Sequence, residues 1–427
     1  MLGLESKYDY TPRMYRRLVF AATQAVSFAD ASEALAELGE LKLLPKRVWR
    51  AVKRIGGERV AECRAAAAQY EKLPLPARQK NPGTQVPRVA CVQMDGGRFQ
   101  ERERITSEKP AVEELASESQ SESHAAPAEE EADGYWREYK AGVLLSMTSD
   151  VHTVDPCPEL PATFMDPGKM REIAREIKGF TSDSPVSVKA DEEAGPDFKE
   201  RQGRPETLVK SVVATCGDVK VFGPLLANAA YERGFHAAPR KAFVADGSTT
   251  NWGVWSKYFS HYTPILDFVH ALMYVYAGAM AGRSPNEGWL HYRDWAQWLW
   301  GGETDRLLAA LQARQQELGV PDDKEKGTPR AQVASSLGYL TNQRQRMQYP
   351  KYRQQGLPLT SSPIESTVKQ INRRIKGTEK FWSEGADPML HLVADRLSQT
   401  NVTPHFWSRR VDRLIQAASY DSHHQAS

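Results

Sequence analysis

Two short apolar runs in this chain are each followed by an Asp-Gly pair. The first run, residues 90–94, leads into Asp95, and the second, residues 242–245, leads into Asp246. At the carboxyl end of a strand in an α/β sheet a side chain is exposed to a crevice, and an adjacent glycine lets a ligand or backbone approach closely. The pattern predicts two strands of an α/β layer whose aspartates could share a metal ion if the strands are adjacent and parallel.

Each aspartate also has a purely structural interpretation. Asp-Gly-Gly at 95–97, between two strand-like runs, is typical of a tight hairpin. The residues after Asp246 are compatible with a strand that turns into a helix capped by Ser248. Both alternatives stay open at the level of the sequence.

Other segments fit the same layer. Strand-like sequence covers 87–105 and 135–148, and helices are expected at about 168–178 and 206–234. Strands that alternate with helices indicate an α/β domain. The length of 427 residues allows about three domains of ordinary size.

A third carboxylate stands at the head of a basic segment. Ser362 as N-cap with Glu365 three residues later predicts a capping box, which explains the glutamate without any function. From Glu365 onward, Lys369, Arg373 and Lys376 follow at helical spacing and share one face. A carboxylate followed by a basic stripe suits a phosphate backbone.

Charge is segregated along the chain, although its sum is only +2. Residues 1–60 hold 11 basic and 7 acidic side chains, residues 101–134 hold 3 and 11, and residues 341–382 hold 9 and 2. Two basic segments therefore flank an acidic one. For nucleic-acid binding, the position of the charges matters more than their sum. Within the acidic segment, residues 106–133 lack aromatic side chains and are rich in Glu, Ser, Ala and Pro, which predicts a disordered loop inside a domain.

The first basic segment is predicted to form three helices, which open near Pro12, Ser27 and Pro45. In the third helix the apolar residues at 48, 52 and 55 form one face. A three-helix unit with a basic last helix resembles a helix-turn-helix, and a helical bundle with a solvated basic face is the alternative. The DNA-binding candidates of this segment lie largely off the apolar face: Lys46, Arg50 and Arg54.

Cysteine usage and hydropathy argue against several classes of protein. The four cysteines form no CxxC pair and no secreted-type framework, which favours a reducing cytoplasm. The charged first residues lack the apolar stretch of a signal peptide. The most apolar stretch, residues 265–281, is short for a bilayer and contains Asp267 and His270, so we expect a buried helix and no membrane association.

Two further features have a structural and a functional interpretation. Asp267, His270 and Tyr274 share a helix face, where we expect a buried hydrogen-bonded Asp/His pair; a role beside the catalytic residues or in DNA-end recognition is the alternative. Six of the ten tryptophans lie between residues 252 and 300. We expect them mainly in the core, with stacking on an unpaired base as the alternative.

Four strings carry a resemblance to a known family. QMDGGRFQ at 93–100, ADGSTTNW at 245–252, LDFVHA at 266–271 and SSPIESTVKQINRRIKGTEKFW at 361–382 resemble, in this order, bacterial insertion-sequence transposases of the DDE class. The resemblance covers about residues 88–410, and its last two motifs are the more specific.

The resemblance implies an RNase H-like catalytic domain with a catalytic, metal-binding triad. By it, Asp95 ends the first strand, Asp246 ends the fourth, and Glu365 lies on a helix after a helical insertion. It implies two Mg²⁺ ions, for which Mn²⁺ can substitute, with water as the attacking group in cleavage and a 3′-hydroxyl in joining. The implied partner is double-stranded DNA, at transposon ends and target, bound by a homodimer in the cytoplasm and at the nucleoid.

The predicted fold class is α/β: an RNase H-like mixed sheet with flanking helices, an N-terminal helical module and a helical insertion. The predicted layout is a DNA-binding module at 1–75, the first part of the catalytic core at 86–250, an aromatic-rich insertion at 251–355, the last core helices at 356–410 and a tail at 411–427. On the Glu365 helix the expected DNA-binding residues are Lys369, Arg373, Arg374 and Lys376. Two rival functions are a nuclease with the same triad but no joining activity, and a non-catalytic DNA-binding descendant of a transposase.

Overall fold

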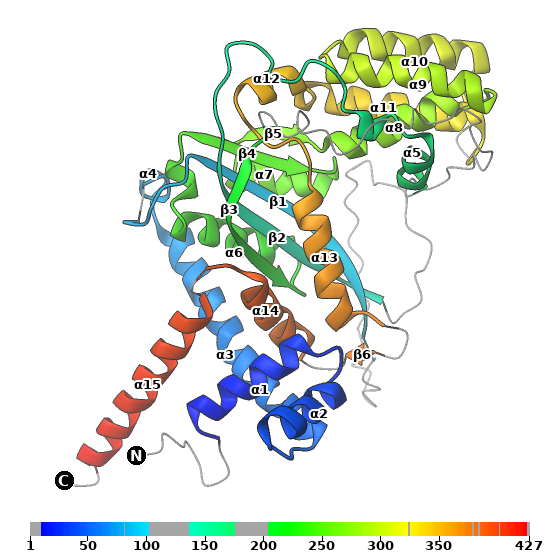
Figure 1. Cartoon of the computed structure of the whole chain (residues 1–427). Coiled ribbons are helices and arrows are strands. Elements are labelled where there is room, and N and C mark those ends of the chain that lie inside the picture. Colours follow the sequence, from blue (N-terminus) through cyan, green and yellow to red (C-terminus); the bar gives the residue numbers. More distant parts are fainter. Residues whose placement is uncertain are drawn as a thin grey trace, which may run out of the picture.

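The computed structural model describes residues 10–80, 82–101, 136–175, 204–322, 325–377, 380–382, 385–400 and 402–424. The loop predicted at 106–133 lies outside them. A mixed sheet with helices around it forms the centre of the molecule (Figure 1). The predicted α/β class, a mixed sheet with flanking helices, is confirmed.

The five main strands are arranged in the order β3-β2-β1-β4-β5. The first three pair antiparallel, whereas β4 is parallel to β1 and β5 is parallel to β4. A short sixth strand pairs with the end of β1. The strands are β1 (Val89–Glu101), β2 (Trp136–Thr148), β3 (Glu206–Thr215), β4 (Arg240–Ala245), β5 (Thr263–Leu266) and β6 (Phe381–Trp382).

Two expectations about the strands were wrong. Asp95 neither ends β1 nor lies in a tight hairpin turn, because β1 continues to Glu101 and its residues 95–97 pair with residues 139–141 of β2. Residues 206–215 are strand β3 and not helix. Their β-branched run pairs with β2 along the sheet edge, and the helix starts only after Asp218, whose side chain caps it.

The N-terminal helices form as predicted and pack on the rest of the molecule. They are α1 (Pro12–Gln24), α2 (Phe28–Gly39) and α3 (Pro45–Lys72). Ser27 and Asp30 form a capping box on α2, and the apolar face of α3 is fully buried. A Cβ at Gly56 of α3 would lie only 2.6 Å from Pro388, which shows how closely α3 approaches the C-terminal part of the chain. The N-terminal module is therefore packed against the C-terminal part of the chain and is not joined to it by a linker alone.

The remaining helices divide into two groups. Around the sheet lie α4 (Leu75–Arg78), α6 (Val219–Glu232), α7 (Thr249–Tyr258), α13 (Ser362–Ile375) and α14 (Ala386–Leu397). A second group lies at the top of Figure 1 and comprises α8 (Phe268–Met280), α9 (Pro285–Trp300), α10 (Thr304–Leu318), α11 (Pro329–Gln343) and α12 (Tyr349–Gln354). Helix α15 (Val402–His424) contacts α1 and α14 and extends away from the sheet, and α5 (Pro167–Ala174) lies beside the second group (Figure 1). We call α8 to α12 the helical insertion. Because β5 belongs to the sheet, this insertion begins at Phe268, later than the predicted boundary at 251.

The most apolar segments are part of the core. Helix α8 is 13 residues long and mostly buried, and no helix in the described ranges is long and apolar enough to cross a membrane. Of the six clustered tryptophans, Trp252, Trp289, Trp295 and Trp300 are buried and the other two pack against the core. The core interpretation of the tryptophans is confirmed.

Candidate functional site

Asp95, within β1, and Asp246, directly after β4, come from neighbouring parallel strands. The parallel register of β1 and β4 pairs Gln93 with Val244, and each aspartate follows two residues after its member of this pair. Since side chains alternate along a strand, Asp95 lies on the same sheet face as Gln93. The position of Asp246 directly after β4 agrees with the expectation, whereas that of Asp95 within β1 does not.

Glu365 is brought to this face by α13, which packs on β1 and β2. Gln93 connects the helix start to the strand: its Nε2 donates to the carbonyl of Thr360 at 2.9 Å, and its Oε1 accepts from the backbone N–H of Ile364 at 3.3 Å. Gln93 is fully buried. The side chain two residues before Asp95 thus fixes the helix turn that carries Glu365.

The capping box predicted for this helix is wrong. The N-cap is Ser361, it makes no side-chain capping bond, and Glu365 lies one position too far along the helix for the box. The Ser361 hydroxyl instead donates to Asp267, a residue distant in sequence. The capping explanation of Glu365 therefore fails.

The three predicted acids lie near enough for Asp246 and Glu365 to affect the pKa of Asp95. Burial raises the pKa of the Asp95 carboxyl, and the charges of Asp246 and Glu365 raise it further, to about 6. The backbone N–H of Gly96 and the charge of His270 act in the opposite direction. Two carboxylates whose charges raise the pKa of a third form a site with excess negative charge, which a cation would stabilise.

The closest cluster of potential ligands is a different one. Among the described residues, the ligand atoms of Asp267, His270 and Glu365 all lie within 4.8 Å of one another. Asp267 is fully buried, and its oxygens accept bonds from the backbone N–H of His270 at 2.7 Å, from His270 Nδ1 at 3.1 Å and from both donors of Ser361. With its acceptor sites used in this way, Asp267 holds α8 against the start of α13 rather than being available to a metal.

His270 places a positive charge beside the acids. Burial would lower its pKa, but the hydrogen bond and charge of Asp267, together with the charges of Asp246 and Glu365, raise the pKa of His270 to about 9. The expected Asp267–His270 pair is confirmed. Tyr274, the third residue of that helix face, stacks on Tyr339 of α11 with ring centres 3.7 Å apart.

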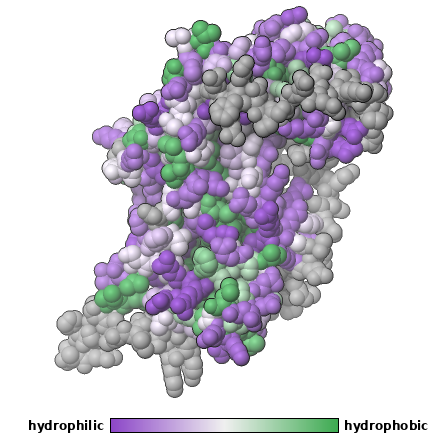
Figure 2. Space-filling view, viewed as in Figure 1, coloured by the Kyte–Doolittle hydropathy of each residue, from purple (hydrophilic) through white to green (hydrophobic). Residues whose placement is uncertain are grey.

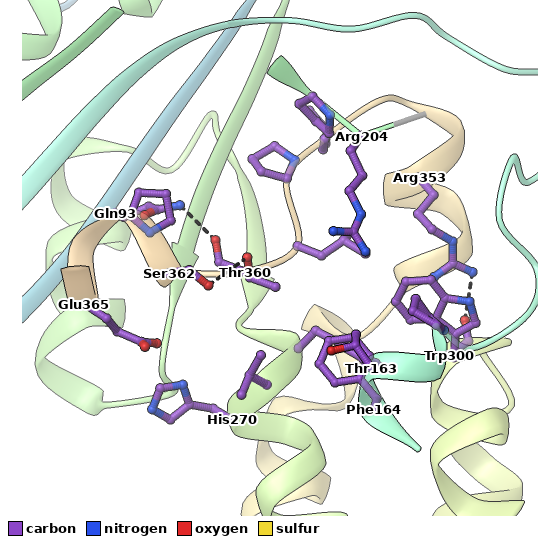
Figure 3. A pocket seen from close by; sticks show the side chains of 18 of the residues that line it. Gln93, Thr163, Phe164, Arg204, His270, Trp300, Arg353, Thr360, Ser362 and Glu365 are labelled. Carbon is purple, nitrogen blue, oxygen red and sulfur yellow. Dashed lines mark hydrogen bonds between the residues drawn. The ribbon is translucent and has the colours of Figure 1, made fainter. Parts of the chain in front are cut away.

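A cavity of about 680 Å³ lies next to Glu365. In Figure 3, Glu365 and His270 point toward each other at one end, and Arg204 extends into the cavity nearer its other end. Apolar side chains such as Phe268 and Met147 form part of its wall. The site therefore has room for a sizeable ligand beside the acids, with basic groups further along the wall.

The predicted basic stripe of α13 is exposed in part. Lys369, Arg373 and Lys376 are exposed, and the surface over α13 is mainly hydrophilic (Figure 2). Arg374 is only 4% exposed: its Nε donates to the carbonyl of Ala22 at 2.9 Å. Arg374 is therefore not placed to bind DNA, because its guanidinium is buried against the N-terminal helices.

In the N-terminal module the three candidates also differ. Lys46 and Arg50 are exposed on the first turns of α3. Arg54 donates to the Tyr15 hydroxyl at 3.1 Å and lies over that ring. Arg54 thus packs between α3 and α1, whereas Lys46 and Arg50 are exposed to solvent and could contact DNA.

Three side chains at the site were not predicted from the sequence: Gln93, Asn251 and Tyr339. Gln93 had a detectable signal, since it shares a strand face with Asp95 at a spacing of two. Asn251, whose Nδ2 donates to Asp246 Oδ1 at 2.7 Å, lies five residues after that aspartate, in the first turn of α7. Tyr339 lies 93 residues from Asp246, and no local pattern indicates their contact.

Comparison with known proteins adds no assignment. No protein-family model matches the chain, and no curated protein shows significant sequence similarity to it.

The raised pKa of Asp95 gives a stability prediction. Asp95→Asn should stabilise the metal-free protein at pH 8 by on the order of 2 kcal/mol, because the folded state then no longer carries a partly buried charge beside two other acids. The gain should decline as the pH falls through about 6 and vanish below the ordinary carboxyl pKa of 3.8, where Asp95 is protonated in both states. Urea unfolding across this pH range measures it.

Asp166→Asn is a matched control for this experiment. Asp166 caps α5, and asparagine caps a helix equally well, so its stability should change little at any pH. A destabilised Asp95→Asn protein at pH 8 would show that the carboxylate is held by favourable contacts and not by repulsion.

Proposed function

We propose that this protein is a DDE-class DNA transposase, which cleaves DNA strands and joins them to a target with the help of divalent metal ions. The observation that carries the proposal is the convergence of Asp95, Asp246 and Glu365 on one face of the sheet. These residues come from β1, the end of β4 and α13, yet the charges of Asp246 and Glu365 contribute to the raised pKa of Asp95. Acids gathered at such an energetic cost are typical of functional sites.

The donor set fits magnesium. Mg²⁺ prefers a few carboxylate oxygens completed by water and substrate phosphate oxygens, and Asp95, Asp246 and Glu365 supply carboxylates only. These three residues would hold the metal. Two bound Mg²⁺ ions would stabilise the attacking and leaving oxygens of an in-line phosphodiester displacement. His270 and Asp267 would hold Glu365 in place from the other side.

The strand arrangement supports an RNase H-like core. Three antiparallel strands are followed by two strands parallel to the first, and helices lie around the sheet. The helical insertion stands between β5 and α13, so it separates Asp246 from Glu365 in sequence, as the resemblance implies.

The charged surface supports double-stranded DNA as the substrate. Lys369, Arg373 and Lys376 continue from Glu365 along the exposed face of α13. A DNA backbone that contacts these side chains would reach the acids at the head of the helix. Lys46 and Arg50 would add contacts from α3, and a homodimer would hold paired DNA ends.

A strand-transfer assay tests the proposal. Purified protein, Mg²⁺ and DNA that carries the sequences flanking the reading frame should yield joined products, whose junctions can be sequenced. Pre-cleaved ends that are never joined, together with metal-dependent cleavage, would indicate a nuclease without joining activity. Duplex binding with no metal-dependent cleavage would indicate a non-catalytic descendant and would overturn the enzymatic proposal.

A further inference from the structure

The backbone turn that carries Asp246 is bound by the helical insertion. The hydroxyl of Tyr339 on α11 donates to the carbonyl of Asp246 at 2.5 Å, and Gln343 Nε2, one turn further along, donates to the carbonyl of Gly247 at 3.1 Å. These bonds join residues more than 90 positions apart in the chain. Two consecutive carbonyls of the turn therefore depend on one helix outside the sheet.

Gly247 shows how tight this contact is. Its φ is +91°, and a Cβ placed on it would lie 2.7 Å from the Tyr339 hydroxyl and 3.0 Å from the ring. Only glycine satisfies both the left-handed backbone and the approach of the ring. Tyr339 is in turn stacked on Tyr274 of α8 with an interplanar angle of 13°. The ring that contacts the turn is thus held by a second helix of the insertion.

The carboxylate of Asp246 is oriented from the opposite side. Its Oδ1 accepts from Asn251 Nδ2 at 2.7 Å and from the backbone N–H of Ser248 at 3.0 Å, both belonging to the start of α7. Within the described ranges Oδ2 accepts no hydrogen bond. The backbone of Asp246 is fixed by α11, one carboxylate oxygen is fixed by α7, and the other oxygen remains for a ligand.

We infer that Tyr339 is a positioning residue for metal binding, and that the helical insertion keeps Asp246 in the orientation that binds the metal. The inference rests on the proposed function, because it assumes that Asp246 is a metal ligand. Partners that orient a ligand typically change metal affinity by about 10- to 100-fold. The helical insertion then contributes to the metal site, in addition to any role that it has in DNA binding.

Direct Mn²⁺ binding tests this inference without any DNA. Tyr339→Phe removes one hydroxyl and keeps the ring, and it should weaken Mn²⁺ binding about 10-fold in calorimetry or in electron paramagnetic resonance titrations. Gln343→Met, which removes the second donor, should weaken binding in the same direction. Circular dichroism and thermal unfolding of each variant establish that the fold is retained.

Tyr292→Phe is the matched control. Tyr292 is a buried tyrosine of α9, in the same insertion, and its hydroxyl donates to the carbonyl of Phe164 at 2.9 Å. Both tyrosine variants lose one hydroxyl-to-carbonyl bond, so their thermal stabilities should fall by similar amounts. Only Tyr339→Phe should lose Mn²⁺ affinity.

The outcomes separate the inference from the proposed function. If Asp246→Ala loses Mn²⁺ binding while folded Tyr339→Phe and Gln343→Met bind like the wild type, the inference is overturned and the metal site stands. If Asp246→Ala binds Mn²⁺ as well as the wild type, Asp246 is not a ligand, and both the inference and the proposed triad fail.

Discussion

Alanine in place of Asp95, Asp246 or Glu365 is expected to lower Mg²⁺-dependent DNA cleavage at least about 1,000-fold, with duplex binding largely retained. On the proposed function, each substitution removes one of the three carboxylates that would hold the cations stabilising the displacement. The basic side chains of α13 stay in place, so the electrostatic contribution to DNA binding persists. Single-turnover cleavage and a gel-shift titration measure the two effects on the same preparations.

Glu172→Ala is a suitable control for the triad. Glu172 lines the same cavity from α5 and is exposed, and the main groups that shift the pKa of Asp95 do not include it. Its loss should leave cleavage within a few-fold of the wild type. Undiminished cleavage by any one of the three triad variants would mean that the converged acids do not act as a catalytic unit.

The second large effect is expected at Arg374. Arg374→Ala should destabilise the protein by about 3 to 5 kcal/mol, because the side chain is buried and donates to the carbonyls of Ala22 and Val26 at the end of α1. Its guanidinium also lies 4.4 Å from the centre of the Phe28 ring. Removing it leaves two carbonyls without this donor and a cavity between α13 and the N-terminal module.

Arg373 provides the comparison, since it is the neighbouring residue on the same helix but is exposed. Arg373→Ala should leave the unfolding free energy within about 0.5 kcal/mol of the wild type. It should weaken duplex binding and reduce the salt dependence of binding by about one charge. Chemical denaturation and DNA titrations at several salt concentrations distinguish the two arginines; equal stability losses would contradict the burial of Arg374.

Local sequence was sufficient where local interactions decide the structure. Ser27 and Pro45 marked the starts of α2 and α3, and the spacing of Val48, Val52 and Ile55 identified the buried face of α3. Caps and helical periodicity depend on residues within one or two turns, so they can be read without knowledge of the fold.

Predictions from the local sequence were wrong where the conformation or burial of a segment depends on the segment that it pairs or packs with. Residues 95–97 have the composition of a turn, but pairing with β2 along their whole length keeps them in a strand. Arg373 and Arg374 were both predicted to bind DNA, although only Arg373 lies on the basic stripe, and the packing of the N-terminal helices against α13 buries Arg374. Glu365 was expected to complete a capping box with Ser362, but the N-cap lies one residue earlier, at Ser361, whose hydroxyl contacts both Glu365 and Asp267, the latter 94 positions away.

The sequence by itself determined which chemical groups are present: three carboxylates beside glycine or basic residues, and a basic helix face. The tertiary structure decided that these carboxylates lie close enough to raise the pKa of Asp95, that Gln93 and Asp267 hold α13, and that Tyr339 binds the Asp246 turn. The physical reason is that side-chain type is a local property. Charge repulsion, burial and hydrogen bonding between distant segments depend on distances that only the packed chain sets.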